Sequence, residues 1–274
     1  MLLDSVFIGW ARVSFEKELE EFSQKVLCDR HLTLQTYQSY PNLTFVAYRG
    51  DEIEAYISAS MSQSSLTINN FHYKEDIDDS IKERLVDILL QNVDKGVESI
   101  SVLAHKEEKS IFEKSGFTIY GKFSQALYSG DAVAFNFSNA MAKRISGENF
   151  LPIMRAKDKK AYREDRGEYL SNIMKQSSLV LSTPNGYQHS SVLSKGLIKI
   201  SPWVMEDASY TDSEQLLRGV IHHRGLKKLI AFIPSDVKEI TDLYRSYNFE
   251  LTNNMLLMYS HHKPQINLEM IYAY

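Results

Sequence analysis

The chain has 274 residues, of which 43% are hydrophobic and 24% are charged, and its formal net charge is -4. The length fits two domains of ordinary size, because about 100–150 residues is the commonest domain length. A weakly acidic chain has no long-range attraction for a phosphate backbone, which argues against a nucleic-acid partner. Acidic residues come too early for a signal peptide, and no run approaches the ~18 apolar residues of a membrane helix, so we expect no membrane partner.

The chain contains one cysteine, Cys28, which excludes an internal disulfide and any zinc site built on paired cysteines. Cys28 lies in a helical pattern, which favours a buried structural thiol over a catalytic one. A single cysteine also suits a reducing cytoplasm. The adjacent pairs His222-His223 and His261-His262 do not share a helix face, so we expect no metal site.

The first half of the chain predicts helices and strands in a definite order. Apolar residues at helical spacing predict a helix over residues 14–27. Two strand-like stretches around the turn signal Arg49-Gly50-Asp51 predict a hairpin over residues 43–62. The elements that follow are a strand over 65–73, an amphipathic helix over 78–96, a buried strand over 97–105, a short helix over 107–117 and a closing strand over 118–129.

The second half predicts the same order of elements. They are a helix over 158–174, a hairpin over 178–193, a strand over 196–202, a helix over 211–223, a buried strand over 227–234, a helix over 237–249 and a closing strand over 256–261. The tail, residues 263–274, is apolar enough to pack against the protein. The two patterns meet near residues 129–150, so we expect domains over 1–135 and 136–274.

The apolar pattern of the first half repeats in the second half at an offset of 132 residues, with no gap needed. Such a pattern marks the residues that face a core. Leu66, Ile68, Leu85, Ile88, Leu89, Phe112 and Phe117 recur as Ile198, Ile200, Leu217, Val220, Ile221, Tyr244 and Phe249. The sequence therefore predicts two similar domains.

The order helix, hairpin, strand, helix, strand, helix, strand resembles the GNAT acyltransferase fold. The segments SIFEKSGF and DLYRSYNF resemble a GNAT segment with an apolar residue, an aromatic residue, three variable residues and then Gly-Phe. The stretches YREDRGEYL, NGYQHSS, ISPWVMEDASYTDSEQLL and LLMYS resemble the second GNAT-like domain of certain tandem acetyltransferases. The resemblance implies an α/β fold of two tandem GNAT-like domains, each a mixed sheet flanked by helices.

The resemblance also implies an acyl-CoA donor, such as acetyl-CoA, and a small-molecule or peptide amine as acceptor. GNAT proteins hold the coenzyme's diphosphate in a basic, glycine-rich loop at a helix N-terminus. Both corresponding loops here, residues 71–81 and 202–214, lack glycine and are acidic, and Lys74 is the only cation of the first loop. Carboxylates at a helix start cap its N–H groups and repel a diphosphate, so both loops depart from the family.

The resemblance assigns coenzyme-binding residues to the end of one strand and the start of the next helix. In the first half these residues are Phe71, His72, Tyr73, Ser80 and Ile81. In the second half they are Trp203, Val204 and Met205. His72 could also take a proton from the amine, or it could be an exposed loop histidine.

The resemblance further implies that a tyrosine in the last helix protonates the departing thiolate. The second half has Tyr244 at this position, whereas the first half has Phe112, which has no proton to give. A buried tyrosine whose hydroxyl bonds to a carbonyl is the alternative for Tyr244. A polar residue seven positions earlier is His105 in the first half and Val237 in the second. His105 could bond the coenzyme or relay a proton, or it could be a solvated turn histidine.

We therefore expect a cytoplasmic, acyl-CoA-dependent N-acyltransferase whose acceptor the sequence does not identify. The alternative is a catalytically inactive GNAT-fold binding or scaffold protein, which the glycine-free loops and Phe112 favour. A third possibility, an aminoacyl transferase that uses charged tRNA, is disfavoured by the net charge of -4.

Overall fold

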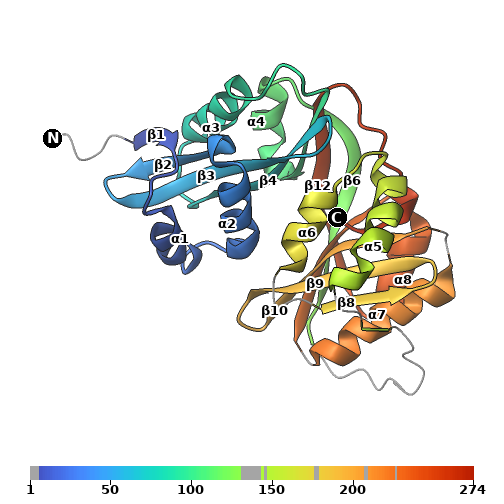
Figure 1. Cartoon of the computed structure of the whole chain (residues 1–274). Coiled ribbons are helices and arrows are strands. Elements are labelled where there is room, and N and C mark those ends of the chain that lie inside the picture. Colours follow the sequence, from blue (N-terminus) through green and yellow to red (C-terminus); the bar gives the residue numbers. More distant parts are fainter. Residues whose placement is uncertain (1–5, 131–142, 145–146, 176–178, 207–208, 226) are drawn as a thin grey trace. The chain divides into compact units, whose positions relative to one another are not determined.

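The computed structural model describes residues 6–130, 143–144, 147–175, 179–206, 209–225 and 227–274. The chain forms two compact units (Figure 1). Unit 1 consists of residues 1–120 and 256–264, and unit 2 consists of residues 121–255 and 265–274. Each unit is discontinuous in sequence, unlike the continuous ranges 1–135 and 136–274 expected from the repeat. The expected boundary at residue 135 lies outside the described residues.

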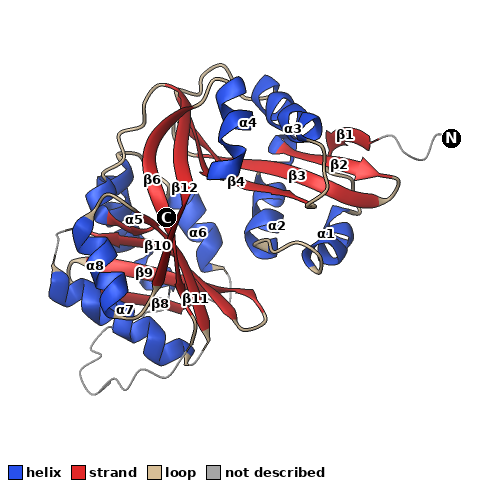
Figure 2. Ribbon diagram, turned by 180° about the vertical axis from the view of Figure 1, so that it is seen from behind, coloured by secondary structure: helices blue, strands red, loops and turns tan. Residues whose placement is uncertain are grey.

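Unit 1 is a mixed sheet between two pairs of helices, with strand order β1-β2-β3-β4-β5-β12. Its strands are β1 (Val6–Trp10), β2 (Thr44–Arg49), β3 (Glu52–Met61), β4 (Ser65–Tyr73), β5 (Ser99–His105) and the second part of β12 (Glu250–His261). Its helices are α1 (Phe15–Ser23), α2 (Arg30–Ser39), α3 (Asp79–Gln91) and α4 (Lys109–Lys114), with the short 3-10 turns η1 (Pro41–Leu43) and η2 (Lys106–Glu108). Figure 2 shows α1 and α2 on one face of this sheet and α3 and α4 on the other.

Unit 2 repeats this arrangement with strand order β6-β11-β10-β9-β8-β7, and β13 pairs with β10. Its strands are β6 (Thr118–Tyr128), β7 (Lys143–Arg144), β8 (Leu179–Thr183), β9 (Gly186–Ser194), β10 (Leu197–Met205), β11 (Lys228–Pro234) and β13 (Ile271–Ala273). Its helices are α5 (Gly147–Tyr162), α6 (Gly167–Met174), α7 (Tyr210–Arg224) and α8 (Lys238–Ser246), with the 3-10 turn η4 (Leu268–Met270). One core lies under α7 and α8 and a second lies under α5 and α6.

The closing strands of the two units are exchanged relative to the sequence order. Strand β6 ends the first half of the chain, but it pairs antiparallel with β11 of unit 2, where Ala126 lies opposite Ala231. The first unit is completed instead by β12, whose Leu256 and Met258 are buried in the unit 1 core. The prediction that residues 118–129 close the first half is therefore wrong for residues 121–128.

The gap-free repeat holds in most of the chain but fails at one strand. Leu66 of β4 corresponds to Ile198 of β10 at an offset of 132, while their parallel neighbours Ile100 and Leu229 are only 129 residues apart. The counterpart of His105 at the end of β5 is consequently Pro234 rather than Val237. This corrects the pairing expected from the sequence.

The pairing of Phe112 with Tyr244 is not affected by this shift. The N–H of Phe117 donates to the carbonyl of Phe112 over 3.0 Å, and the N–H of Phe249 donates to the carbonyl of Tyr244 over 3.1 Å. Both aromatic residues thus end their helices in the same way.

Replacing Met258 with alanine tests the strand exchange, because this side chain is fully buried among unit 1 residues. We expect Met258→Ala to cost about 2–5 kcal/mol of unfolding free energy. Native-state hydrogen exchange should become faster in β5 of unit 1. Val192→Ala, at a valine of β9 that is 51% exposed, is the control and should cost little. Faster exchange confined to unit 2 would contradict the exchange of strands.

Candidate functional site

Strands β4 and β5 of unit 1 separate at their carboxyl ends. They pair in parallel from Ser65 and Ser99 to Ile68 and Val102, and within these described strands the pairing ends there. Strand β4 continues to Tyr73 and β5 to His105. We call these separated stretches, residues 69–73 and 103–105, the unit 1 divergence.

The backbone of β4 presents peptide groups to the unit 1 divergence. The N–H of Lys74 donates to the carbonyl of Glu54 on β3 over 2.9 Å. Bonding directions alternate along an antiparallel strand, so His72 also faces β3, whereas the peptide groups of Phe71 and Tyr73 face the divergence. This stretch of β4 is therefore a strand edge, to which an extended chain can pair.

Unit 2 contains the same divergence, but a segment of its own chain fills it. Strands β10 and β11 pair in parallel only as far as Lys199 and Ile230. Beyond that point β13 pairs antiparallel with β10, with Ala273 opposite Trp203. The N–H of Tyr274 donates to the carbonyl of Phe232 on β11 over 2.9 Å. The C-terminal strand therefore bonds to both separated strands.

The predicted acid Tyr244 is bound to this inserted strand. Its hydroxyl donates to the carbonyl of Tyr272 over 3.0 Å, and the side chain is fully buried. Burial raises the pKa of Tyr244 well above its ordinary value. The ring of Trp203 packs against Tyr244 and Tyr272, with centroids 5.8 and 5.2 Å away. This is the arrangement of the alternative, a buried tyrosine bonded to a carbonyl.

The predicted coenzyme residues of the second half lie in the core of unit 2. Trp203, Val204 and Met205 have no exposed surface. The indole N–H of Trp203 donates to the sulfur of Met205 over 3.2 Å. The structure thus brings these residues together with β13 and leaves none of them at the protein surface.

The start of α3 in unit 1 is capped by a carboxylate, as the sequence predicts. Asp78 Oδ1 accepts from the N–H of Ser80 over 2.8 Å, and hydrogen bonds from Ser80 hold the pKa of Asp78 below its ordinary value. The N–H of Ile81 donates to the carbonyl of Asp78 over 3.0 Å. The N–H groups of Ser80 and Ile81 are thus already bonded within the chain.

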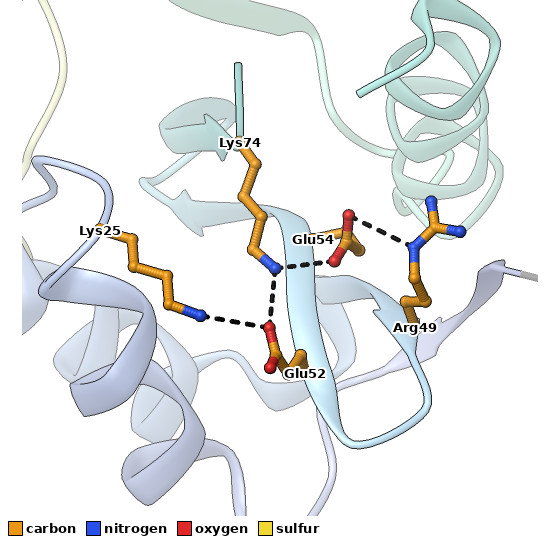
Figure 3. A network of polar contacts seen from close by, with 5 residues as sticks. All are labelled: Lys25, Arg49, Glu52, Glu54 and Lys74. Atoms are coloured by element: carbon orange, nitrogen blue, oxygen red, sulfur yellow. Dashed lines mark hydrogen bonds and ion pairs between the residues drawn. The ribbon is translucent and has the colours of Figure 1, made fainter. Parts of the chain in front are cut away.

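The single cation of the 71–81 loop is held by carboxylates of β3. Lys74 Nζ lies 3.0 Å from Glu52 Oε2 and 2.7 Å from Glu54 Oε1 (Figure 3). Lys25 adds a second cation to Glu52, and Arg49 lies 3.6 Å from Glu54. Burial lowers the pKa of Lys74, but the two carboxylates outweigh this and raise it. The charge of Lys74 is therefore balanced by its own strand neighbours.

His105 lies at the carboxyl end of β5, where its side chain caps η2. The imidazole accepts from the N–H of Glu108, and Glu108 Oε2 accepts from the N–H of His105 over 2.7 Å. Burial raises the pKa of Glu108, and the His105 N–H opposes this shift. The hydroxyl of Tyr73 donates to the same carboxylate. Sequence reasoning missed Glu108, although its place three residues after a cap is the spacing of a capping box.

Aromatic rings line the α3 and α4 side of unit 1 next to the divergence. Phe71 lies between Phe112 and Tyr73, with ring centroids 5.4 Å away in both cases. Phe112 is fully buried. His72 points to the other face of the sheet, where its ring centroid is 5.4 Å from that of Tyr56. The structure thus places Phe71, Tyr73 and His105 around the divergence and His72 away from it.

Within the described ranges, no group of three or more His, Cys, Asp or Glu residues is placed to hold a metal ion. No helix among those residues is long and apolar enough to cross a membrane.

No family model matches the chain, and no curated protein sequence matches it. Solved structures do. A putative acetyltransferase from Pyrococcus horikoshii matches with a TM-score of 0.78 at 15% identity, over 100% of this chain and 95% of that chain. A tandem GNAT protein from the clavulanic acid biosynthesis pathway matches with a TM-score of 0.63 at 6% identity, over 95% of this chain and 100% of that chain.

The chain has a tandem GNAT fold. A GCN5-related N-acetyltransferase from Sphaerobacter thermophilus agrees, with a TM-score of 0.59 at 12% identity over 98% of this chain and 100% of that chain. The predicted fold class, α/β with two tandem GNAT-like domains that are each a mixed sheet flanked by helices, is confirmed. Likeness at these identities shows the GNAT fold alone.

Replacing Tyr244 with phenylalanine tests its bond to the C-terminal strand. Tyr244→Phe leaves the buried carbonyl of Tyr272 without its donor, so we expect a loss of about 1–3 kcal/mol in unfolding free energy at neutral pH. Tyr259→Phe, at a partly exposed tyrosine of β12, is the control. An unchanged stability of Tyr244→Phe in urea titrations would contradict a buried, bonded hydroxyl.

The same variant should alter the alkaline limb of the stability profile. Because the pKa of Tyr244 is raised in the folded state, its stabilising contribution is present below about pH 10 and is lost as the pH rises further. Urea titrations of the wild type and Tyr244→Phe above pH 10 should show a shallower fall in the variant. An identical fall would show that the hydroxyl is not desolvated.

Proposed function

We propose that the chain is an acyl-CoA-dependent N-acyltransferase with one coenzyme site, in the unit 1 divergence. The observation that carries the proposal is the contrast between the two units. In unit 2, β13 takes the position between the separated strands. In unit 1, none of the described segments pairs with β4 beyond Ile68 on that side. A single cysteine in 274 residues supports a cytoplasmic location.

The separated part of β4 suits the pantetheine arm of an acyl-CoA better than the start of α3 suits its phosphates. The pantetheine arm is an extended chain with amide groups, and β13 demonstrates that an extended, amide-bearing chain can lie in such a divergence. At the phosphate end, Asp78 caps α3 and Lys74 is paired with Glu52 and Glu54. Binding would therefore draw on the pantetheine contacts more than on charge.

The reaction requires a nucleophilic amine, a stabilised oxyanion and a departing thiolate. The amine nitrogen attacks the thioester carbonyl carbon, the oxyanion collapses with cleavage of the carbon–sulfur bond, and the amine loses one proton. Peptide N–H groups of Phe71 and Tyr73 face the divergence and are suited to donate to the oxyanion. Phe112 gives no proton, so the thiolate would leave without an acid from α4. Thiols are acidic enough, with a pKa of about 8.5 for the cysteine side chain, for a thiolate to leave without prior protonation.

We assign His105 as the residue that passes the amine's proton to solvent. It is exposed, it lies at the end of β5, and its ring is oriented by the N–H of Glu108. The neutral imidazole has a single acceptor nitrogen, so the ring has to release the Glu108 N–H when it takes the proton. The acceptor amine in this proposal is a small molecule or a peptide.

A second candidate function is a binding module without catalysis, and β13 favours it. The occupant of the unit 2 divergence is a peptide strand, and both units share the acidic, glycine-free loop. In this case the unit 1 divergence would hold an extended peptide by strand addition.

Thermal unfolding with acetyl-CoA separates these two functions. Acetyl-CoA at about 100 times its dissociation constant should stabilise the chain by ~2.7 kcal/mol. His105→Ala should keep this shift and lower turnover of an amine, because His105 moves a proton and does not hold the coenzyme. The absence of any shift at millimolar acetyl-CoA would contradict the acyltransferase. Thermal stabilisation by the peptide Ile-Tyr-Ala-Tyr, without stabilisation by acetyl-CoA, would favour the binding module.

The stoichiometry of binding tests the assignment to unit 1. Isothermal titration should give one acetyl-CoA per chain, because β13 closes the unit 2 divergence. Tyr244→Phe should leave the affinity unchanged, since Tyr244 lies in unit 2. Two coenzyme molecules per chain would contradict the assignment.

A further inference from the structure

Two adjacent asparagines form a β-bulge in β4, at the point where this strand leaves β5. Ser58 of β3 lies opposite Asn70, and the next residue, Ala59, lies opposite Ile68. Asn69 is therefore the extra residue of the bulge, one position beyond the last parallel pair of Ile68 with Val102. A bulge bends its strand and turns the residues that follow it.

The side chain of Asn70 is buried, and both its nitrogen and its oxygen are hydrogen-bonded. Its Nδ2 donates to Ser58 Oγ over 2.8 Å, and its Oδ1 accepts from the hydroxyl of Thr33 over 3.0 Å. The same hydroxyl lies 3.0 Å from that of Tyr56. Asn70 thus ties β4 both to β3 and to α2.

Asn69 makes a matching set of bonds one turn along α2. Its Nδ2 donates to Ser60 Oγ over 2.8 Å and to Thr36 Oγ1 over 3.3 Å. Consecutive residues of a regular strand point to opposite faces, yet Asn69 and Asn70 both reach the α2 face. Only the bulge allows this, so the side-chain bonds and the bulge stabilise one another.

Unit 2 forms the corresponding bulge without asparagines. The register of β10 with β9 shifts between Ile200 and Trp203, and the residues in between are Ser201 and Pro202. These are the counterparts of Asn69 and Asn70 at the offset of 132. The fold alone therefore does not require the asparagine pair. Unit 1, whose divergence is not filled by β13, has it.

We propose that Asn69 and Asn70 are positioning residues for the acyl-CoA. Their bonds to α2 and β3 fix the bulge, and the bulge directs the peptide groups of Phe71 and Tyr73 into the unit 1 divergence. The asparagines act through the backbone and touch no reacting atom. This inference rests on the proposed function of unit 1.

The first test combines acetyl-CoA affinity with hydrogen exchange in the absence of ligand. Asn69→Ala and Asn70→Ala should each weaken acetyl-CoA binding about tenfold, the scale of one or two lost hydrogen bonds. Exchange at residues 71–73 should become faster, while exchange in β8 of unit 2 stays unchanged and reports an intact fold. Wild-type affinity and wild-type exchange in both variants would overturn the proposal.

Thr67→Ala is the matched control. Thr67 lies on the same strand, and its hydroxyl is 3.3 Å from that of Ser101, in the paired part of β4 and β5. Thr67→Ala removes a comparable side-chain hydrogen bond at a position before the bulge. Acetyl-CoA affinity should therefore stay within about twofold of the wild type. A loss equal to that of Asn69→Ala would mean that general destabilisation, and not the bulge, is responsible.

Thr36→Val is the alternative test variant if the asparagine variants do not fold. It removes a partner of Asn69 from α2 without altering β4, and we expect a smaller loss of affinity, about threefold. If the wild type binds no acetyl-CoA, the proposed function fails on its own. Exchange at residues 71–73 then still decides whether the asparagines hold the bulge, and unchanged exchange overturns the inference.

Discussion

Peptide N–H and C=O groups that leave water must find hydrogen-bond partners, and two parallel strands that separate inside a fold create a row of such groups. Both units of this chain contain such a separation. Unit 2 satisfies it internally, because β13 bonds to β10 and Tyr274 bonds to Phe232 of β11. Unit 1 offers the peptide groups of Phe71 and Tyr73 to a ligand. The proposed function depends on this difference between the units more than on any catalytic side chain.

At the start of α3, where GNAT proteins hold the coenzyme's diphosphate in a glycine-rich loop, unit 1 has an acidic loop without glycine. Asp78 occupies the helix N-terminus, and Lys74 is neutralised by Glu52 and Glu54. A ligand with phosphates meets a helix start whose N–H groups already have an acceptor. In the proposed complex, attraction by charge would therefore contribute little, and contacts along the separated strand would have to supply most of the affinity. The asparagine pair at the bulge suits that requirement, because it fixes the strand itself.

The sequence predicted the elements whose inward residues are apolar, because the repeat in those residues reports the core directly. Helix α2 was missed since its buried residues, Thr33 and Thr36, are polar and leave no apolar stripe. The offset at β5 was missed because a shorter connection before β11 is compensated by the longer helix α8, which has 9 residues where α4 has 6. The exchange of β6 and β12 was also out of reach, since two closing strands of similar pattern can pair with either sheet.

In the site, too, local interactions could be predicted from the sequence and contacts between distant segments could not. The carboxylate cap of α3 could be predicted, because Asp78 lies at the cap position before the helix and this interaction is local. The fate of Tyr244 could not, because its partner, the carbonyl of Tyr272, comes from a distant tail segment whose pairing depends on the folded sheet. The roles of Glu108 and of the asparagine pair likewise depend on contacts between elements that are distant in the sequence.

Hydrogen exchange with and without saturating acetyl-CoA tests the central claim, that the coenzyme lies between β4 and β5 while β13 fills the equivalent place in unit 2. Exchange resolved along the chain should slow on binding at residues 69–73 and 103–105 and remain unchanged at residues 203–205 and 271–274. Slower exchange at the second pair of segments without the first, or release of residues 271–274 by the ligand, would contradict the account.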